Sequence, residues 1–246
     1  MRQVIVIPAR YESSRFPGKP LVSILGKSLI FRVWERCVNA ALADSVFVAT
    51  DDERIRDHCI GFGANVVMTP SDCLTGTDRL YAANKTLMAD SVINVQGDEP
   101  LVDPADIALM ARMHLENPEV ILNGMGPILD ESEYRSSAVP KVVTSPDGKL
   151  LYMSRGPIPS NKKFQFTSGQ KQICIYGFSS SHLEAFGRCG NKTPLEELED
   201  IEILRFLEMG YHVQMVNLKS PAIAVDLPAD VPRVEAVLKK LLESGL

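Results

Sequence analysis

The chain has 246 residues and a formal net charge of −5, with 45% hydrophobic and 23% charged residues. This composition is typical of a globular protein with one large α/β domain or two small ones, which can bury a core without disulfide or metal staples. Because the net charge is negative, we expect no broad nucleic-acid or anionic-membrane footprint, although local cationic loops remain compatible with a small anionic ligand.

The five cysteines are odd in number, widely spaced and without a C-x-x-C pair, so they predict neither a disulfide framework nor a structural zinc site. Arg2 is the only charged residue before the first apolar run, and no small-residue cleavage site follows a long apolar region, so we expect no signal peptide. No apolar run approaches the ~18–20 residues of a membrane span. We therefore expect a cytoplasmic protein with no membrane partner.

The first half of the chain alternates short apolar runs with helical spacing. Expected strands cover residues 1–7, 46–50, 66–68 and 91–95, and expected helices cover 29–41, 53–62, 76–88 and 104–115. This alternation predicts βαβ units with right-handed crossovers, and hence an α/β fold with a mostly parallel sheet flanked by helices.

The pattern changes near Val120. Two apolar runs, 139–144 and 150–153, flank an Asp-Gly turn and predict a β-hairpin, and another strand is expected over 172–178. We expect about 126–180 to be an inserted region in a single domain that spans 1–246. Its hairpin edge would need covering, which favours a homodimer.

Helical spacing returns over 181–186, 194–209 and 229–242, with a strand expected at 213–216. Thr193 and Glu196 form a capping-box pattern at the start of the 194–209 helix. Glu196, Glu199 and Glu202 would then lie close to one face of that helix. By itself, such a row is more often a solvated face than a site.

The loop at 9–20 follows the first strand and carries Arg10, Arg15 and Lys19. In an open α/β sheet, ligands bind at the carboxyl ends of strands, where cations, the Ser13 hydroxyl and exposed N–H groups suit a polyphosphate. The alternative is a solvated surface loop. The loop matches neither GxxxxGK[ST] nor GxGxxG, so neither of those binding mechanisms applies.

Carboxylates follow other expected strands at Asp51-Asp52, at Asp98 and at Asp226. Such groups beside a phosphate-binding loop are natural ligands for Mg²⁺, which binds through one or two carboxylates plus substrate phosphates. The alternative for Asp98 is a turn residue or helix cap. For Asp226 it is the N-cap of the last helix.

Two more cationic positions are candidates for the site. The helix entry at 75–79 has N–H groups that could bind an anion, and its Arg79 could hold a phosphate or carboxylate. The alternative is capping by Thr77 or Asp78 with Arg79 exposed. Arg155, at the end of an expected strand, is in isolation more often a surface ion-pair partner.

Taken in order, these stretches resemble the 3-deoxy-manno-octulosonate cytidylyltransferases, or CMP-KDO synthetases. The match spans nearly the whole chain and rests on IPARYESSRFPGKP (7–20), VATDD (48–52), GTDRL (76–80), NVQGDEP (94–100), YMSR (152–155) with IP (158–159), and VDLP (225–228). Each motif is weak alone, whereas the ordered set is specific.

The resemblance implies a nucleotide-diphospho-sugar transferase-like fold and a homodimer. It also implies transfer of CMP from CTP to the anomeric hydroxyl of KDO or a close relative, with Mg²⁺ as cofactor. Lys19, Arg15, Asp98 and Asp226 would be catalytic, the two aspartates as metal ligands. The expected nucleotide-binding residues are Ala9, Arg10, Ser13, Lys19, Asp51, Thr75, Gly76, Arg79 and Gln96. The expected sugar-acid residues are Arg79, Gln96, Arg155, Gln172, Tyr176, Glu199 and Glu202.

Two positions depart from the family pattern. Gln172 stands where the family usually has a histidine of the sugar pocket, and Ile203 replaces a glutamine on the late helix. Glutamine keeps hydrogen bonding but cannot carry charge. Both changes fall on the sugar side, so a cytidylyltransferase for another acid, such as an amino-ulosonate or a phosphonate, stays open. Retention of both Asp98 and Asp226 argues against a non-enzymatic nucleotide-binding domain.

Overall fold

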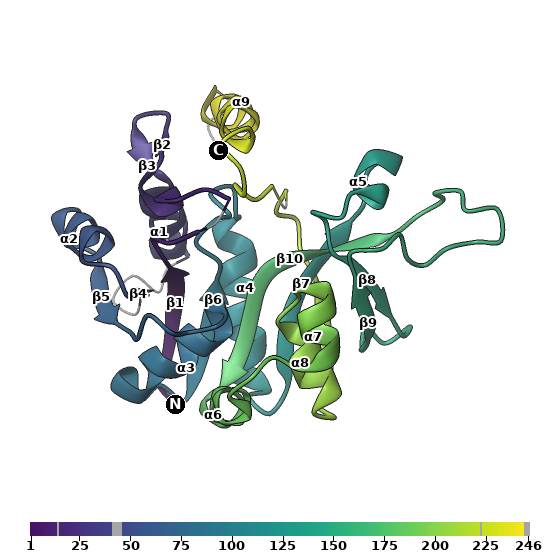
Figure 1. The fold of residues 1–246 in the computed structure, drawn as a ribbon, viewed down its shortest axis with the longest axis horizontal. Helices are drawn as coiled ribbons and strands as arrows, with labels where there is room; N and C mark the ends of the chain where they lie inside the picture. The colour runs from purple at the N-terminus through teal and green to yellow at the C-terminus, as the bar shows by residue number, and fades with distance from the viewer. Residues whose placement is uncertain (14, 41–45, 222, 244–246) are drawn as a thin grey trace.

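One β-sheet runs through the computed structural model, which describes residues 1–13, 15–40, 46–221 and 223–243 (Figure 1). In these residues the sheet has nine strands, and its main path runs in the order β11-β7-β10-β6-β1-β4-β5. The strands of this path are β1 (Gln3–Ala9), β4 (Val46–Thr50), β5 (Asn65–Met68), β6 (Ser91–Val95), β7 (Ile121–Pro127), β10 (Gln170–Ser179) and β11 (Val213–Asn217). β8 (Lys141–Thr144) and β9 (Leu150–Ser154) form a hairpin that pairs with β10.

Every strand of the main path is parallel except β10, which runs antiparallel to its neighbours β6 and β7. β1 pairs with β4 so that Ala9 lies opposite Thr50, and with β6 so that Gln3 lies opposite Ser91. The carboxyl ends of β1, β4 and β6 therefore meet at one edge of the sheet, which is the edge where α/β proteins bind ligands.

Helices cover both faces of the sheet. The apolar cluster on one face includes α1 (Leu29–Asn39), α2 (Glu53–Gly61), α4 (Pro104–Glu116) and α9 (Asp230–Glu243), and that on the other includes α3 (Gly76–Leu87), α6 (Ser180–Cys189) and α8 (Ile203–Glu208). In β1, Ile5 and Ile7 face the first cluster, whereas Val4 and Val6 face the second. Burial on both faces explains why this strand is a continuous apolar run. No helix in the described part of the chain is long and apolar enough to span a bilayer.

Between β7 and β10 the chain builds a projection beside the sheet. It contains α5 (Glu131–Arg135), the β8–β9 hairpin and a loop, and these extend to one side of the body (Figure 1). The expected hairpin is present, with Gly148 N–H donating to Ser145 O at 2.9 Å in its turn. The expected inserted region, 126–180, includes this projection, but it begins within β7 of the main sheet and extends through the whole of β10 to the first residue of α6.

The expected α/β class with a mostly parallel sheet is confirmed, and most expected elements agree with the structure within a few residues. β7 was not predicted, because Asn123, Gly124 and Gly126 give it low β propensity. A Cβ on Gly124 would lie 2.9 Å from the backbone oxygen of Ile173 on β10, so packing in the sheet favours glycine at this position. The short β2 (Ser23–Ile24), β3 (Lys27–Ser28), η1 (Lys19–Leu21) and α5 were also not predicted. Residue 41 of the expected 29–41 helix and residue 14 of the opening loop lie outside the described residues.

The continuous helix expected over 194–209 is wrong. Two short helices, α7 (Pro194–Glu199) and α8, are separated by a turn at Asp200, whose φ of 51° is left-handed. The Arg155 guanidinium donates to the carbonyl oxygens of Glu199 at 2.5 Å and of Asp200 at 2.9 Å. These tertiary hydrogen bonds hold the turn and outweigh the local helix propensity.

The packing of α6 on α3 requires a glycine at position 187. An added Cβ would lie 1.9 Å from Cδ1 of the Tyr81 ring. We expect Gly187→Ala to lower the free energy of unfolding by about 1–3 kcal/mol through overpacking, although alanine is the better helix former. Urea unfolding measures this. The matched control is Gly61→Ala in α2, where no atom lies within 4 Å of an added Cβ. Equal unfolding midpoints for the two variants would contradict the prediction.

Candidate active site

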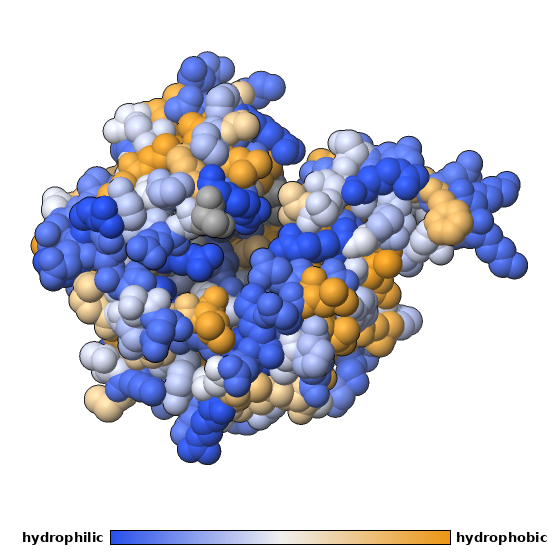
Figure 2. Space-filling view, in the orientation of Figure 1, coloured by the Kyte–Doolittle hydropathy of each residue, from blue (hydrophilic) through white to orange (hydrophobic). Residues whose placement is uncertain are grey.

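A cleft of about 610 Å³ opens at the carboxyl ends of β1 and β6, between the body of the protein and the projection (Figure 2). Its lining comes from stretches far apart in the sequence, because the topology brings the residues after each parallel strand to the same edge. The expected site residues that line it are Ala9, Arg10, Ser13, Arg15, Lys19, Thr75, Gly76, Arg79, Gln96, Asp98, Arg155, Gln172, Tyr176, Glu202 and Asp226. Asp51 and Glu199 are not part of the lining.

Lys19 joins two aspartates in the cleft. Its Nζ lies 2.9 Å from Asp98 Oδ2 and 3.3 Å from Asp226 Oδ1, and Arg15 Nη2 lies 3.5 Å from the same Asp226 oxygen. Burial opposes the charged form of Lys19, but the charges and hydrogen bonds of Asp98 and Asp226 outweigh burial and raise its pKa. Two carboxylates and two cations therefore form a compact, nearly neutral cluster, which we call the aspartate–lysine cluster.

Local backbone contacts position this cluster. A Cβ on Gly97 would lie 2.7 Å from Pro8 O, so the turn that presents Asp98 passes β1 only because residue 97 is glycine. Val225 N–H donates to Asp98 O at 2.9 Å, which holds the Asp226 segment beside Asp98. The Asp226 N–H itself donates to Asp230 Oδ2. The Asp226 carboxylate is therefore directed at Lys19 and Arg15, and the alternative reading of Asp226 as the N-cap of the last helix does not hold.

Arg79 and Asp51 form one unit at the wall of the cleft. Arg79 Nη2 lies 3.1 Å from Asp51 Oδ2, and Nη1 donates to Thr69 Oγ1 at 2.5 Å. The Arg79 side chain is 4% exposed, so the alternative of an exposed arginine is excluded. Arg79 lines the cleft but Asp51 does not, so Asp51 contacts the arginine and is not exposed to a ligand in the cleft.

The helix entry at 75–79 is already occupied by a carboxylate of the chain. Glu202 accepts from Gly76 N–H at 2.9 Å, from Thr77 N–H at 2.8 Å and from Thr77 Oγ1 at 2.6 Å. Thr75 Oγ1 accepts from Asp78 N–H and caps the helix. In contrast to the expectation, these Gly76 and Thr77 N–H groups are therefore not available to a nucleotide. Burial raises the pKa of Glu202.

The three glutamates of the expected row do not share a face. Glu196 binds the fully buried Arg205, with Oε2 2.6 Å from Nε, and Arg205 Nη1 also reaches Asp78 Oδ1 at 2.9 Å. Glu199 instead accepts from Ser154 Oγ at 2.6 Å. Each glutamate thus ties α7 or α8 to a different part of the protein. The buried Arg205 network was missed because a charged residue in a helix pattern is ordinarily solvent-facing.

Arg155 is likewise bound to the protein. Besides the Glu199 and Asp200 carbonyls, its guanidinium donates to Ser137 O at 2.9 Å. Arg155 and Ser137 both belong to the projection, and Glu199 and Asp200 belong to the turn between α7 and α8, so Arg155 connects the projection with that turn. A surface salt bridge, the alternative from sequence, is a minor part of its contacts, since the nearest carboxylate oxygen of Asp200 lies 3.9 Å away.

Gln172 is oriented by a network on β7 and β10. Asn123 Nδ2 donates to the carbonyl oxygens of Ile173 at 3.1 Å and Ile175 at 3.0 Å, so its Oδ1 must accept. Gln172 Nε2 donates to that Oδ1 and to Tyr176 OH, both at 3.0 Å. With both amide protons used, Gln172 offers its carbonyl oxygen to the cleft. Sequence reasoning missed Asn123 together with β7.

Several lining residues were not predicted. Lys171 forms a buried ion pair with Glu133 at 2.7 Å, and both line the end of the cleft nearest the projection. Glu99 is 5% exposed and accepts from Cys174 N–H at 3.1 Å. Burial, with the Asp98 charge, raises the pKa of Glu99 above its ordinary value of 4.5, to about 7. The sequence did contain a signal that Glu99 lines the site, because this residue directly follows Asp98.

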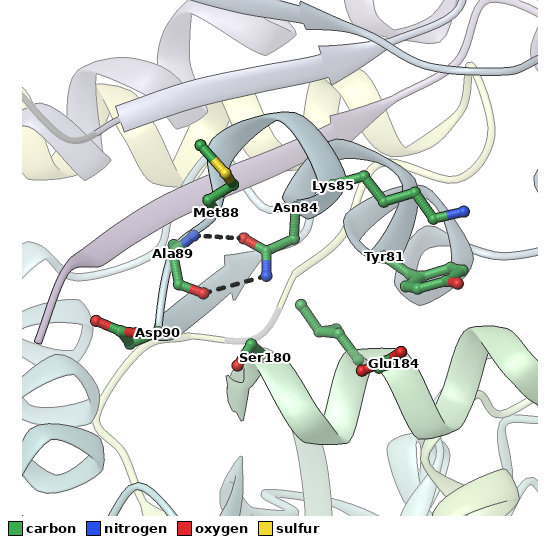
Figure 3. Close-up of a pocket in the computed structure, with 9 residues that line it drawn as sticks. Tyr81, Asn84, Lys85, Met88, Ala89, Asp90, Ser180 and Glu184 are labelled. Carbon is green, nitrogen blue, oxygen red and sulfur yellow. Dashed lines mark hydrogen bonds between the residues drawn. The ribbon is translucent and has the colours of Figure 1, made fainter.

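A second hollow lies at the opposite, amino-terminal end of β6 (Figure 3). In it, Asn84 exchanges two hydrogen bonds with the backbone of Ala89, and Lys85 packs over the Tyr81 ring. Asn84 thus closes the C-terminal turn of α3. Among the described residues that line this hollow, none form a cluster comparable to the aspartate–lysine cluster, so the cleft is the better candidate site.

Comparisons with known proteins agree with one another. A family model described as cytidylyltransferase matches residues 4–218. The chain is 44% identical to a 3-deoxy-manno-octulosonate cytidylyltransferase of Syntrophotalea carbinolica, over 96% of this chain and 98% of that one. It is 39% identical to the mitochondrial protein of the same name from Arabidopsis thaliana, over 97% and 84%. The solved structure of CMP:2-keto-3-deoxy-manno-octonic acid synthetase complexed with CTP has a TM-score of 0.89 and 34% identity, covering 98% of this chain and 99% of that chain.

Glu99 should make stability depend on pH. The folded protein keeps the Glu99 proton up to about pH 7, whereas the unfolded chain releases it near pH 4.5. Stability contributed by neutral Glu99 is thus fully present below pH 4.5 and falls as pH rises to 7, by roughly 3 kcal/mol at most. We expect Glu99→Gln, which keeps an acceptor for Cys174 N–H, to reduce this loss. Urea unfolding from pH 4.5 to 7.5 measures it.

The control for this prediction is Glu116→Gln, which changes an exposed glutamate at the end of α4. This variant should retain the pH dependence of the parent protein. If Glu99→Gln and Glu116→Gln follow the same curve, Glu99 is ionised throughout the range and the prediction fails.

Proposed function

Because the chain belongs to the cytidylyltransferase family, we propose that it transfers CMP from CTP to the anomeric hydroxyl of KDO or a closely related 3-deoxy-2-ulosonic acid. The products would be the CMP-sugar and pyrophosphate. The observation that carries the proposal is the aspartate–lysine cluster, with Lys19 within 3.3 Å of both Asp98 and Asp226 at the strand-end edge of the cleft. The family membership also confirms the resemblance drawn from the motifs.

The chemistry calls for positioning and charge neutralisation. The anomeric oxygen attacks the α-phosphorus of CTP in line, a new O–P bond forms, and the bond from the α-phosphorus to the bridging oxygen of pyrophosphate breaks. Lys19, Arg15 and Arg10 line the cleft where the triphosphate would lie, and would neutralise charge on the departing pyrophosphate. Such preorganised cations are the main source of rate in phosphoryl chemistry that needs no covalent intermediate.

We propose Mg²⁺ as the cofactor, held by Asp98 and Asp226. These residues fit Mg²⁺, because carboxylate oxygens are among the ligands that this ion prefers. The two carboxylates are far apart in sequence but converge on one point, which the Lys19 ammonium marks. Within the described residues no group of three or more His, Cys, Asp or Glu could hold a metal, so phosphate and water oxygens would complete the coordination. Bound Mg²⁺ would supply charge neutralisation on the triphosphate and activation of the attacking hydroxyl.

The acceptor would lie at the end of the cleft nearest the projection, lined by Lys171, Gln172, Tyr176 and Arg155. The Arg79 and Arg155 guanidiniums are held by protein oxygens, so each would act on the acid carboxylate through charge and without changing its own contacts. These two guanidiniums are preorganised, which is the form that electrostatic recognition favours.

A second candidate is the same reaction with another acid, such as an amino-ulosonate. The observation that favours it is the fixed orientation of Gln172, at a position where the family usually has histidine: its Nε2 donates to Asn123 and Tyr176, which leaves its carbonyl oxygen to accept from a ligand. An acceptor with a hydroxyl or ammonium donor at that point fits this oxygen, whereas an anionic group does not.

The remaining expectations are proposals of the same kind. A homodimer would cover Leu151 on β9 and Leu195 and Leu198 on α7, which are exposed apolar residues. Within the described residues β9 pairs only with β8, and a bridge to β11 is made by Lys149, just before β9, so the other edge of β9 itself is unpaired. A cytoplasmic location and a role in lipopolysaccharide or capsule synthesis would follow from CTP and KDO as substrates.

The direct test is pyrophosphate release with CTP and Mg²⁺ across a panel of acids that includes KDO, amino-ulosonates and phosphonates. We expect turnover with a 3-deoxy-2-ulosonic acid and at least about a 10³-fold loss of kcat/KM in Asp98→Asn, because the lost charge acts on the transition state. The thermal melt of the variant should stay close to the parent value. If no acid causes CTP to release pyrophosphate, the proposed reaction is rejected. Near-normal turnover by Asp98→Asn would reject the role of Asp98.

Gln172→His should change the choice of acid more than the use of CTP. Histidine lacks the side-chain amide that binds Asn123, so the carbonyl oxygen that Gln172 offers to the cleft as a hydrogen-bond acceptor is lost. We expect kcat/KM for KDO relative to the amino-ulosonate to rise about tenfold, a change of about 1.4 kcal/mol, with the KM for CTP within about twofold of the parent. Steady-state kinetics with both acids measure this. A parallel change for both acids would mean that Gln172 does not select the acceptor.

A further inference from the structure

We propose that Lys19 couples nucleotide binding to metal binding: its ammonium occupies the space between Asp98 and Asp226 until the triphosphate draws it away. This inference rests on the proposed function, since it assigns the nucleotide and the metal to the same cluster. It goes beyond that function because it gives Lys19 a role before any substrate is bound, as a competitor of the metal.

The geometry places one cation where another would bind. Lys19 Nζ is 2.9 Å from Asp98 Oδ2 and 3.3 Å from Asp226 Oδ1, so it already takes the two carboxylates proposed as metal ligands. The side chains of Lys19, Asp98 and Asp226 are 18%, 27% and 33% exposed. Partial burial strengthens charge interactions relative to those at an open surface. A divalent ion at the same oxygens would be repelled by the ammonium, so the metal alone must displace Lys19.

The triphosphate removes this competition. Phosphate oxygens accept strong hydrogen bonds from lysine and arginine, and both Lys19 and Arg15 line the cleft beside the aspartates. When Lys19 and Arg15 turn to the phosphates, Asp98 and Asp226 lose their counter-charges and gain affinity for the metal. Nucleotide and metal then strengthen each other's binding by the same factor, as linkage requires.

The ammonium can move while its backbone stays in place. Gly18 precedes Lys19 with φ 72°, Pro20 after it is buried, and Gly18 N–H donates to Tyr11 O at 2.9 Å. Lys19 thus begins the anchored turn η1, and its flexible stem carries a compact point charge. The exchange from carboxylates to phosphates therefore needs only side-chain rotation.

The test is the affinity of Mn²⁺, a spectroscopic substitute for Mg²⁺, measured by electron paramagnetic resonance with and without CTP. With Mn²⁺ alone we expect Lys19→Met to bind about tenfold more tightly than the parent protein, a gain of about 1.4 kcal/mol. CTP should strengthen Mn²⁺ binding in the parent and do so much less in Lys19→Met. Asp98→Asn should remove this Mn²⁺ site, which identifies the signal with the cluster.

Lys27→Met is the matched control. Lys27 forms an exposed pair with Glu35 at 2.7 Å outside the cleft lining, so its removal should leave Mn²⁺ affinity unchanged. If Lys19→Met does not fold, Arg15→Met provides the test. Arg15 is 60% exposed and lies 3.5 Å from Asp226, so we expect a gain of about threefold, which corresponds to about 0.65 kcal/mol.

Unchanged or weaker Mn²⁺ binding in Lys19→Met, or in Arg15→Met where that variant replaces it, would overturn the inference. This failure is distinct from failure of the proposed function. Mn²⁺ affinity is measured without an acceptor, so absence of pyrophosphate release with every acid would leave the Mn²⁺ result standing. Normal pyrophosphate release in the parent with no effect of Lys19→Met on Mn²⁺ would reject only the coupling through Lys19.

Discussion

The charge interaction of Lys19 with Asp98 and Asp226 is the constraint on which the candidate site depends. Lys19 and Asp98 follow the parallel neighbours β1 and β6, and Asp226, which lies before α9, is held beside Asp98 by the hydrogen bond from Val225 N–H to Asp98 O. Because like charges repel at such short distances, two carboxylates can lie together here only if cations such as Lys19 and Arg15 lie between or beside them. The aspartate–lysine cluster is therefore nearly neutral. A polyphosphate that pairs with the two cations, together with a metal ion that pairs with the two aspartates, would keep it nearly neutral.

Other charged residues, in the cleft and behind it, form hydrogen bonds and ion pairs with the protein. Arg155, Arg205 and Glu202 each bind protein groups, and together they hold the α7–α8 turn against the projection and the start of α3. Removing one partner of such a buried pair leaves an unpaired charge, which is more costly than the pair is stabilising. Arg155 and Glu202 thus hold the wall of the cleft in place, with Arg205 buried behind it, while the opening loop supplies cations such as Arg10 to the cleft.

The antiparallel β10 gives the cleft its second side. It lies between β6 and β7, and its start pairs with the β8–β9 hairpin, so the projection continues directly from the main sheet. Gln172 and Tyr176 lie on this strand, with Asn123 on the neighbouring β7. A rigid sheet thus positions the proposed acceptor end, whereas a loop carries the cations proposed for the nucleotide. Positions set by a sheet favour a fixed choice of acceptor.

The sequence by itself determined the α/β class and most strands and helices, because apolar periodicity is a local signal. Strand-end position made Lys19 and Asp98 candidates for one site, and the resemblance of the ordered motifs to a known family added Asp226 to them. Only the tertiary structure decided that Glu202 fills the helix entry at Gly76, that the helix expected over 194–209 breaks at Asp200, and that Asn123 orients Gln172. The physical reason is that each depends on hydrogen bonds between residues about 45 or more positions apart, whose strength in a buried setting exceeds local propensity.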